Sequence, residues 1–315
     1  MSLMPSELAG RLGARLSNAE GGAPLARIAL PGSAQPQDLC FLAPGAHAPV
    51  EQHCGAWLAA VDFGQPNTLV AADVVLACAR AASWLAPRRS AAHRAVRATE
   101  IAATARIAPG VVLGAGVHVG EHTCIAQHVV IEDGVSIGAY SEVGVGTVLR
   151  NHVSIGNRVR IGSHCAIGED GLAYLRDGQA WRAMPAFGSV EIGDDVVVLA
   201  HTVVQAGVLG DTVIAHGCVL DSQVLIGHDS VVGAHTAIAG QTAVAGAARI
   251  GRGCRIGGKV GIGEGVIIAE GITVTAMSMV SRSLERAHAH YSSGWPAEPS
   301  RRWWRRVAWL RRGGE

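Results

Sequence analysis

A histidine and an acidic residue with the potential for acid–base chemistry lie in the segment from Asp221 to Asp229. Histidine titrates near neutral pH, so the imidazole of His228 can take a proton from an attacking amine. A carboxylate within reach orients such a ring and favours its charged form, which makes Asp221 the candidate acidic neighbour. The chain has 14 histidines, so the presence of one histidine near an acidic residue does not by itself identify a site. The fold around His228 must also be considered.

Aliphatic residues that recur every six positions predict the elements that hold these side chains. One run extends from Ile101 to Ile167, and a second extends from Val208 to Val274. A fixed period of six is typical of a hexapeptide β-helix, in which three sides make a triangular coil of about 18 residues. The aliphatic residue of each side points into the core, and the Gly or Ala that usually follows it suits a corner.

The coil length links His228 to a glycine further along the chain. One coil of about 18 residues separates His228 from Gly246, so we expect the two positions to stack. A glycine there allows a substrate carbonyl to approach a backbone N–H that stabilises an oxyanion. The fold therefore predicts a base beside an oxyanion-binding amide.

The chain divides into four parts by its patterns. Residues 1–86 combine helical faces with short strand-like segments and predict a small α/β domain. A polar linker over 87–100 precedes the repeats of 101–281, and 282–315 form a C-terminal tail with a basic helix. The repeats are interrupted at 169–189, where a long insertion predicts a functional loop.

After the insertion the period is not continuous. The repeats restart at Ile192, and they slip in phase by two positions before Val208.

Composition excludes several classes of protein. The chain of 315 residues is 49% hydrophobic and 16% charged, which is enough for a core without disulfides. Its seven cysteines are scattered with no C-x-x-C spacing, which argues against a zinc knuckle and a secreted disulfide framework. No apolar run approaches the length of a membrane span, and the N-terminus lacks the order of a signal peptide. We therefore expect a cytoplasmic protein.

Several segments together resemble one known family, the UDP-3-O-acylglucosamine N-acyltransferases of the bacterial lipid A pathway. The resemblance is most specific in the order of a small α/β domain, a hexapeptide helix with an Asp-Gly…Tyr loop, and a Tyr-Ser-Ser-Gly tail. The segments that carry it are Asp38 to Phe41, Ile155 to Tyr174, Asp221 to Gly246, Thr273 to Val280 and Tyr291 to Pro296.

The resemblance implies a fold and a reaction. It implies a left-handed parallel β-helix that assembles as a homotrimer, with each active site between neighbouring prisms. The family moves a 3-hydroxyacyl group from acyl carrier protein to the 2-amine of a UDP-3-O-acylglucosamine. The 4′-phosphopantetheine arm arrives on the carrier protein, so no cofactor and no metal of the enzyme's own is expected.

The resemblance also assigns roles to individual residues. His228 matches the general base, Asp221 its acidic neighbour and Gly246 the oxyanion-binding amide. Phe41 matches an aromatic residue that stacks on uracil. Further substrate contacts are implied for Asp170, Tyr174, Ser222 and Asp229, and docking of the acidic carrier protein is implied for Arg301, Arg302, Arg305 and Arg306.

Departures from the family pattern keep other hypotheses open. A second histidine of the family falls at Gly265, which allows a paralogue that acylates another UDP-amino sugar or that binds carrier protein without catalysis. A zinc hydratase built on histidines such as His118 and His122 is a further alternative. The basic C-terminal helix could also contact an anionic membrane.

Overall fold

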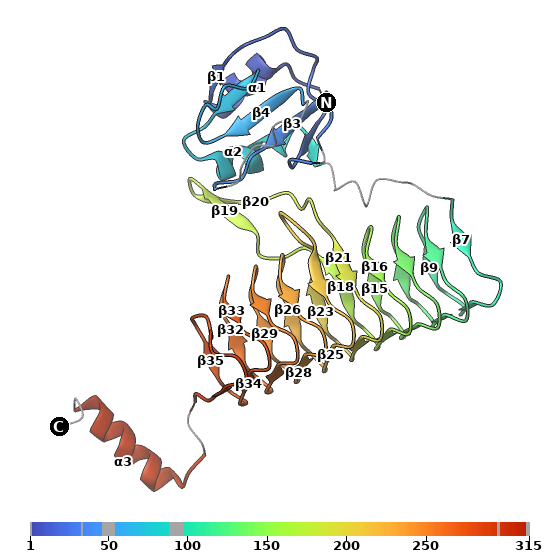
Figure 1. The fold of residues 1–315 in the computed structure, drawn as a ribbon, viewed down its shortest axis with the longest axis vertical. Helices are drawn as coiled ribbons and strands as arrows, with labels where there is room; N and C mark the ends of the chain where they lie inside the picture. The colour runs from blue at the N-terminus through green and yellow to red at the C-terminus, as the bar shows by residue number, and fades with distance from the viewer. Residues whose placement is uncertain (1, 33, 46–53, 88–97, 295–296, 313–315) are drawn as a thin grey trace.

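The protein has an N-terminal domain, a long β-helix and a separate C-terminal helix (Figure 1). The computed structural model describes residues 2–312 except 33, 46–53, 88–97 and 295–296. Most of the linker expected at 87–100 therefore lies outside the described residues. The predicted mainly β class, with a hexapeptide β-helix, is confirmed.

The N-terminal domain is a six-stranded sheet with two helices, in the order β1-β5-β4-β3-β2-β6. β1 runs antiparallel to β5, and the other pairs are parallel. Leu8, Leu39 and Leu58 are fully buried in its core. Its elements are α1 (Pro5–Leu12), β1 (Arg15–Ser17), β2 (Arg27–Ala29), β3 (Asp38–Phe41), β4 (Ala56–Ala59), β5 (Thr68–Val70), α2 (Val74–Ala81) and β6 (Ala86–Pro87).

The β-helix has three parallel sheets, one for each side of the triangle. The first sheet contains β7 (Glu100–Ile101), β10 (His118–Val119), β13 (Ser136–Ile137), β16 (Ser154–Ile155), β21 (Val190–Ile192), β24 (Thr212–Ile214), β27 (Val231–Val232), β30 (Arg249–Ile250) and β33 (Ile267–Ile268). The second contains β8 (Arg106–Ile107), β11 (Cys124–Ile125), β14 (Glu142–Val143), β17 (Arg160–Ile161), β22 (Val197–Val198), β25 (Val219–Leu220), β28 (Ala237–Ile238), β31 (Arg255–Ile256), β34 (Thr273–Val274) and β36 (His290–Tyr291). The third contains β9 (Val112–Leu113), β12 (Val130–Ile131), β15 (Val148–Leu149), β18 (Ala166–Glu169), β23 (Val203–Gln205), β26 (Leu225–Ile226), β29 (Ala243–Val244), β32 (Gly261–Ile262) and β35 (Met279–Val280).

The register repeats every coil, so the aliphatic residues stack in columns. Leu220 pairs with Ile238, and Ile226 pairs with Val244, each 18 residues along the chain. These residues are almost completely buried. Ile101 is 41% exposed, because no coil precedes it.

Histidines at the corners of the prism have a structural role. Among the described residues, seven have a left-handed backbone with φ between 56° and 62°: His122, His128, His152, His164, His201, His235 and His288. Several cover a glycine of the preceding coil; for example, a Cβ on Gly217 would lie 2.5 Å from Nδ1 of His235. His228 is not one of these corner residues, so this explanation does not apply to it.

The regular coil length is broken twice, both times at the same corner. Ile155 pairs with Ile192, which lies 37 residues along the chain, and Ile192 pairs with Ile214 after 22 residues. The extra residues join the third sheet to the first sheet, after β18 and after β23. The first insertion contains a hairpin of β19 (Tyr174–Asp177) and β20 (Ala180–Ala183). The second insertion contains Val208, which the hexad pattern predicted in a core column; that prediction is wrong, because Val208 lies outside the core of the β-helix.

The hairpin joins the β-helix to the N-terminal domain (Figure 1). Asp177 accepts hydrogen bonds from Arg80 of α2 and, at 2.8 Å, from Arg182 of β20. Arg80 and Arg182 lower the pKa of the Asp177 carboxyl to about 2. Phe187 packs into the core of the N-terminal domain, so the insertion is a bridge between the two parts.

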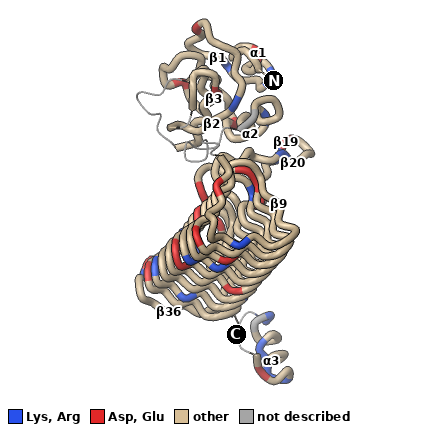
Figure 2. Tube along the Cα trace, turned by 90° about the vertical axis from the view of Figure 1, so that its right-hand side faces the viewer, with Lys and Arg blue, Asp and Glu red and all other residues tan. Residues whose placement is uncertain are grey.

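The repeats extend beyond residue 281, where the sequence pattern ended. Leu284 bridges to Ile268, and β36 pairs with β34. The chain then forms α3 (Ser300–Arg311), which lies beyond the end of the prism with basic residues along its length (Figure 2). Within the described residues, no helix combines the length and the apolar character that crossing a bilayer requires.

Candidate functional site

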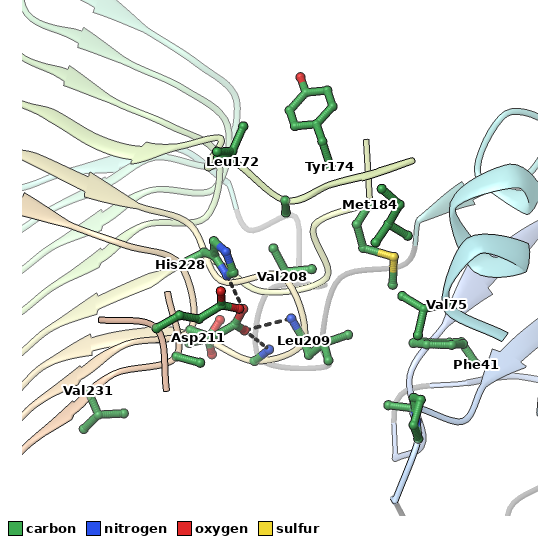
Figure 3. A pocket seen from close by; sticks show the side chains of 18 of the residues that line it. Phe41, Val75, Leu172, Tyr174, Met184, Val208, Leu209, Asp211, His228 and Val231 are labelled. Atoms are coloured by element: carbon green, nitrogen blue, oxygen red, sulfur yellow. Dashed lines mark hydrogen bonds and ion pairs between the residues drawn. The ribbon is translucent and has the colours of Figure 1, made fainter. Parts of the chain in front are cut away.

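A cavity of about 670 Å³ lies where the N-terminal domain, the hairpin insertion and the β-helix meet. Figure 3 shows Phe41 and Val75 of the N-terminal domain across the cavity from His228 of the β-helix. Leu172 and Tyr174 of the insertion also line it. The cavity is thus built from parts of the chain that are far apart in sequence.

One edge of the prism supplies the polar groups. We call the turns that lead from the third sheet to the first sheet the site edge; His228, Gly246 and Glu264 follow β26, β29 and β32 there. Backbone bonds link the successive turns, from Ala247 N to His228 O at 2.7 Å and from Gly265 N to Gly246 O at 3.0 Å. Both irregular coils also open at this edge.

Gly246 lies directly against the His228 ring, as the 18-residue period predicts. A Cβ on Gly246 would lie 2.6 Å from both Cε1 and Nε2 of the imidazole. Any larger residue would therefore displace the ring. The Gly246 N–H has no hydrogen-bond acceptor among the described residues, and Gly246 itself is outside the lining of the cavity.

Asp229 fixes the orientation of the His228 ring. Its Oδ2 lies 2.8 Å from Nδ1 of His228, and its Oδ1 accepts hydrogen bonds from the backbone N–H groups of Leu209 and Gly210 at 2.8 and 2.9 Å. The backbone N–H of His228 donates to Oε1 of Gln205 at 3.2 Å. With Nδ1 held in this way, Nε2 is the nitrogen that remains for proton transfer.

The two side chains shift each other's protonation equilibria. The hydrogen bond that His228 donates to the Asp229 carboxylate raises the pKa of His228 above its usual value, and this outweighs the opposite effect of burial. Burial alone would raise the pKa of Asp229, but the bonds from His228 and the neighbouring amides lower it overall. The pair is therefore a carboxylate beside an imidazole whose charged form is stabilised.

Within one chain, Asp221 is not the acidic neighbour that the sequence suggested. Its carboxylate accepts hydrogen bonds from the backbone N–H groups of Ser222 at 2.7 Å and Gly240 at 3.0 Å. Strand β26 lies between Asp221 and His228, so the two residues occupy different corners of the triangle. Ser222 shares the corner of Asp221, and neither residue lines the cavity.

The other predicted binding residues lie in different settings. Tyr174 is 46% exposed at the cavity, whereas the exposed Asp170 is outside the lining. Phe41 lines the cavity but is buried, and its ring stacks on Phe187 with centroids 6.5 Å apart. Its role in stacking on uracil stays a prediction.

The remaining candidates lie away from the cavity. The predicted docking residues Arg301, Arg302, Arg305 and Arg306 are all on α3. His118 lies 3.5 Å from Glu100, and the His122 ring stacks on Tyr140. In the part of the chain that the structure describes, no three His, Cys, Asp or Glu side chains are grouped as metal ligands would be.

Sequence reasoning missed the supporting residues of the site. Gln205 and the loop that contains Leu209 and Gly210 hold His228 and Asp229 in place, and Arg249 and Glu264 also line the cavity. The phase slip before Val208 was the available signal, because it marks the extra residues of this loop.

The fold and the site define a hexapeptide-repeat protein with a histidine–carboxylate pair at one edge of the prism. Curated relatives named UDP-3-O-acylglucosamine N-acyltransferase confirm the resemblance to that family. The protein from Dechloromonas aromatica is 48% identical over 63 residues, covering 20% of this chain and 18% of the relative. The one from Chromohalobacter salexigens is 45% identical over 139 residues, covering 44% and 40%.

These alignments span less than half of the relatives' own length. No family model matches the chain. Among solved structures, a UDP-N-acetylglucosamine acyltransferase from Campylobacter jejuni is 20% identical with a TM-score of 0.48, covering 59% of this chain and 68% of that one. A UDP-N-acetylglucosamine O-acyltransferase from Moraxella catarrhalis is 28% identical with a TM-score of 0.37, covering 61% and 71%.

Replacing Asp229 with Asn should lower the pKa of His228, because the carboxylate that stabilises the imidazolium is lost. NMR titration of the His228 ring measures this directly. Asp221→Asn removes the same charge from another corner and should leave the His228 titration unchanged. If the His228 pKa fell in the Asp221 variant and not in the Asp229 variant, the predicted pairing of His228 with Asp221 would be supported.

Proposed function

We propose that the protein is an N-acyltransferase of lipid A biosynthesis. It would move a 3-hydroxyacyl group from acyl carrier protein to the 2-amine of a UDP-3-O-acylglucosamine. The observation that carries the proposal is His228, which Asp229 orients, which lies against Gly246 and which lines a cavity shared by two domains. The names of the curated relatives support the same reaction class.

The proposed reaction is a direct transfer. The acceptor nitrogen attacks the thioester carbonyl carbon while Nε2 of His228 takes a proton from that nitrogen. The Gly246 N–H donates to the oxyanion that forms. The C–S bond then breaks, and the imidazolium returns its proton to the leaving sulfur.

Cysteine chemistry is not needed for this route. Cys218 and Cys254 are buried in the prism, and burial raises the pKa of both thiols. A raised thiol pKa reduces the thiolate fraction on which nucleophilic attack depends. This supports transfer without a covalent enzyme intermediate.

The acceptor nucleotide is proposed to bind on the N-terminal side of the cavity. Phe41 would stack on uracil, and Tyr174 would contact the sugar nucleotide from the insertion. The proposal places the uridine on the small domain and the amine at the site edge. A cytoplasmic location follows from the carrier-protein donor.

A homotrimer remains part of the proposal, and one face of the prism supports it. On the third sheet, the outward position just before each buried aliphatic residue is apolar or glycine, a pattern that subunit packing would cover. They are Val112, Val130, Val148, Ala166, Val203, Leu225, Ala243, Gly261 and Met279. This face borders the site edge, which accords with active sites between prisms.

The partner of α3 is proposed to be the acidic acyl carrier protein. Arg301 and Arg305 are exposed, whereas Arg302 and Arg306 pair with Glu298 at 3.2 and 3.3 Å. Guanidinium groups suit carboxylates and phosphates. An anionic membrane is the alternative, because Trp304 and Trp309 are also exposed on this helix.

Two further functions are weaker. A paralogue that acts on another UDP-amino sugar, or that binds without catalysis, fits the glycine at position 265, but the His228 site is intact in geometry. A zinc hydratase would need three ligands together, and the described residues do not group His118 or His122 in this way.

Replacing His228 with Ala should reduce kcat by about 10²- to 10⁴-fold, because the proposed base is removed. Release of carrier-protein thiol in the presence of acceptor measures the rate. His201→Asn is the control, since Asn tolerates the left-handed corner at φ 60° and the site edge is unaffected. Unchanged turnover in the Ala variant would eliminate His228 as the base.

Gly246→Ala should lower kcat by about 10²-fold, because a misplaced catalytic group costs roughly that much. The new methyl would lie 2.6 Å from the His228 ring and push it aside. Gly10→Ala in α1 is the matched control, because a Cβ there meets nothing within 4 Å and the site edge is unaffected. Equal rates for the two variants would contradict the close packing of base and amide.

Changing Arg301 and Arg305 together to Gln should weaken carrier-protein binding by about tenfold, since two charge-assisted contacts are lost. Arg252 and Arg255, which are exposed on the β-helix, provide a control double substitution with the same charge change. Binding is measured by calorimetry, with sedimentation of anionic vesicles in parallel. Loss of vesicle binding alone would favour the membrane alternative.

A further inference from the structure

Glu264 occupies the next position of the site edge after His228 and Gly246. Strands β29 and β32 pair with Val244 opposite Ile262, which places Glu264 one coil beyond Gly246. The hydrogen bond from Gly265 N to Gly246 O at 3.0 Å joins the two turns. Its carboxylate is exposed and lines the same cavity as His228. The edge therefore has an imidazole on one coil, no side chain on the next and a carboxylate on the third.

The His228 ring occupies the space that a side chain at Gly246 would fill, so the ring extends along the site edge in the direction of Glu264. Neighbouring coils lie about 4.8 Å apart, so residues two coils apart are separated by about 10 Å along the edge. A group bound at this edge of the cavity can therefore contact the His228 ring and the Glu264 carboxylate, which both line the cavity.

Of the other charged side chains that line the cavity, the two aspartates already accept hydrogen bonds and the third is a cation. Asp229 is bound by the His228 ring and by two backbone amides, and Asp211 accepts a hydrogen bond from Ser189 N at 2.6 Å. Arg249 is a cation on the neighbouring strand β30. Glu264 is the carboxylate of the lining for which the described residues show no hydrogen bond or ion pair.

We infer that Glu264 recognises the protonated form of the acceptor amine and positions its nitrogen against His228, so that the cavity selects an amine over a hydroxyl acceptor. The inference rests on the proposed function and adds a specificity residue to it. A carboxylate attracts an ammonium group and accepts its N–H bonds, whereas a neutral hydroxyl gains much less from the same partner.

The proton balance of the reaction gives Glu264 a defined part. The acceptor arrives as R–NH₃⁺ and loses one proton to solvent before its nitrogen can attack. The resulting amine donates one N–H to Glu264 and directs the other toward Nε2 of His228. When the N–C bond forms, His228 takes that second proton and passes it to the sulfur as the C–S bond breaks, so the products are an amide, a thiol and one released proton.

The same carboxylate also acts on the base. Asp229 is the main cause of the raised pKa of His228, and the charge of Glu264 adds to it. Removing the Glu264 charge should therefore move the titration of His228 to lower pH. This shift is separate from any contact with substrate and reports that the two side chains face the same space.

The test compares Glu264→Gln with Glu270→Gln. Glu270 follows β33 at a different corner of the prism, where its carboxylate lies 3.7 Å from the ring of His288. Replacing it with Gln removes the same negative charge and leaves the site edge unchanged. The ligands are UDP-3-O-acylglucosamine and its analogue with a 2-hydroxyl in place of the 2-amine. Calorimetry measures their binding without an acyl donor, steady-state rates give kcat and KM, and NMR follows the His228 ring.

Wild-type protein and Glu270→Gln should bind the amine at least tenfold more tightly than the hydroxyl analogue. Glu264→Gln should lose most of this preference, raise KM for the amine about tenfold, leave kcat within about threefold and lower the His228 pKa. Glu264→Asp should recover part of the preference, which a purely structural role would not explain.

The proposal is overturned if Glu264→Gln keeps the amine preference and the wild-type His228 titration, or if wild-type protein binds neither ligand. Wild-type protein that binds the amine selectively but transfers no acyl group would refute the proposed function alone. In that case the binding preference of the Glu264 variant still decides the role of this residue.

Discussion

The structure depends on the parallel pairing of each strand with the strand one coil away. In the regular coils this pairing returns the chain to the same corner after 18 residues, so one aliphatic column fills each side of the core. The same return aligns the turns outside the core. Residues such as His228, Gly246 and Glu264 therefore become neighbours although nothing but the register brings them together.

The departures from this register build the site. Both irregular coils open at the edge where His228 lies, and the second supplies the amides of Leu209 and Gly210 that hold Asp229. The first contains a hairpin that contacts the N-terminal domain, where Arg80 donates a hydrogen bond to Asp177. A repetitive scaffold thus becomes specific at the one edge where its repetition is interrupted.

The features that depend on the six-residue period could be predicted from the sequence. The six-residue period predicts the β-helix and the stacking of His228 on Gly246, and both are present. Within one chain the His228 ring meets Asp229 and not Asp221, because β26 separates Asp221 from the ring, and spacing along the chain does not show this. Asp229 depends on the amides of a loop outside the repeat, and no period describes how that loop folds back.

The bridge formed by the insertion affects how the two halves of the molecule can move. Arg80 and Arg182 bind Asp177 while Phe187 is buried in the core of the small domain, so the insertion is attached to that domain at two points. Any tilt of the small domain must carry the hairpin with it. A tilt of the small domain would therefore also displace the chain beside the imidazole, since a Cβ on Gly171, near the start of the hairpin, would lie 3.0 Å from the His228 ring.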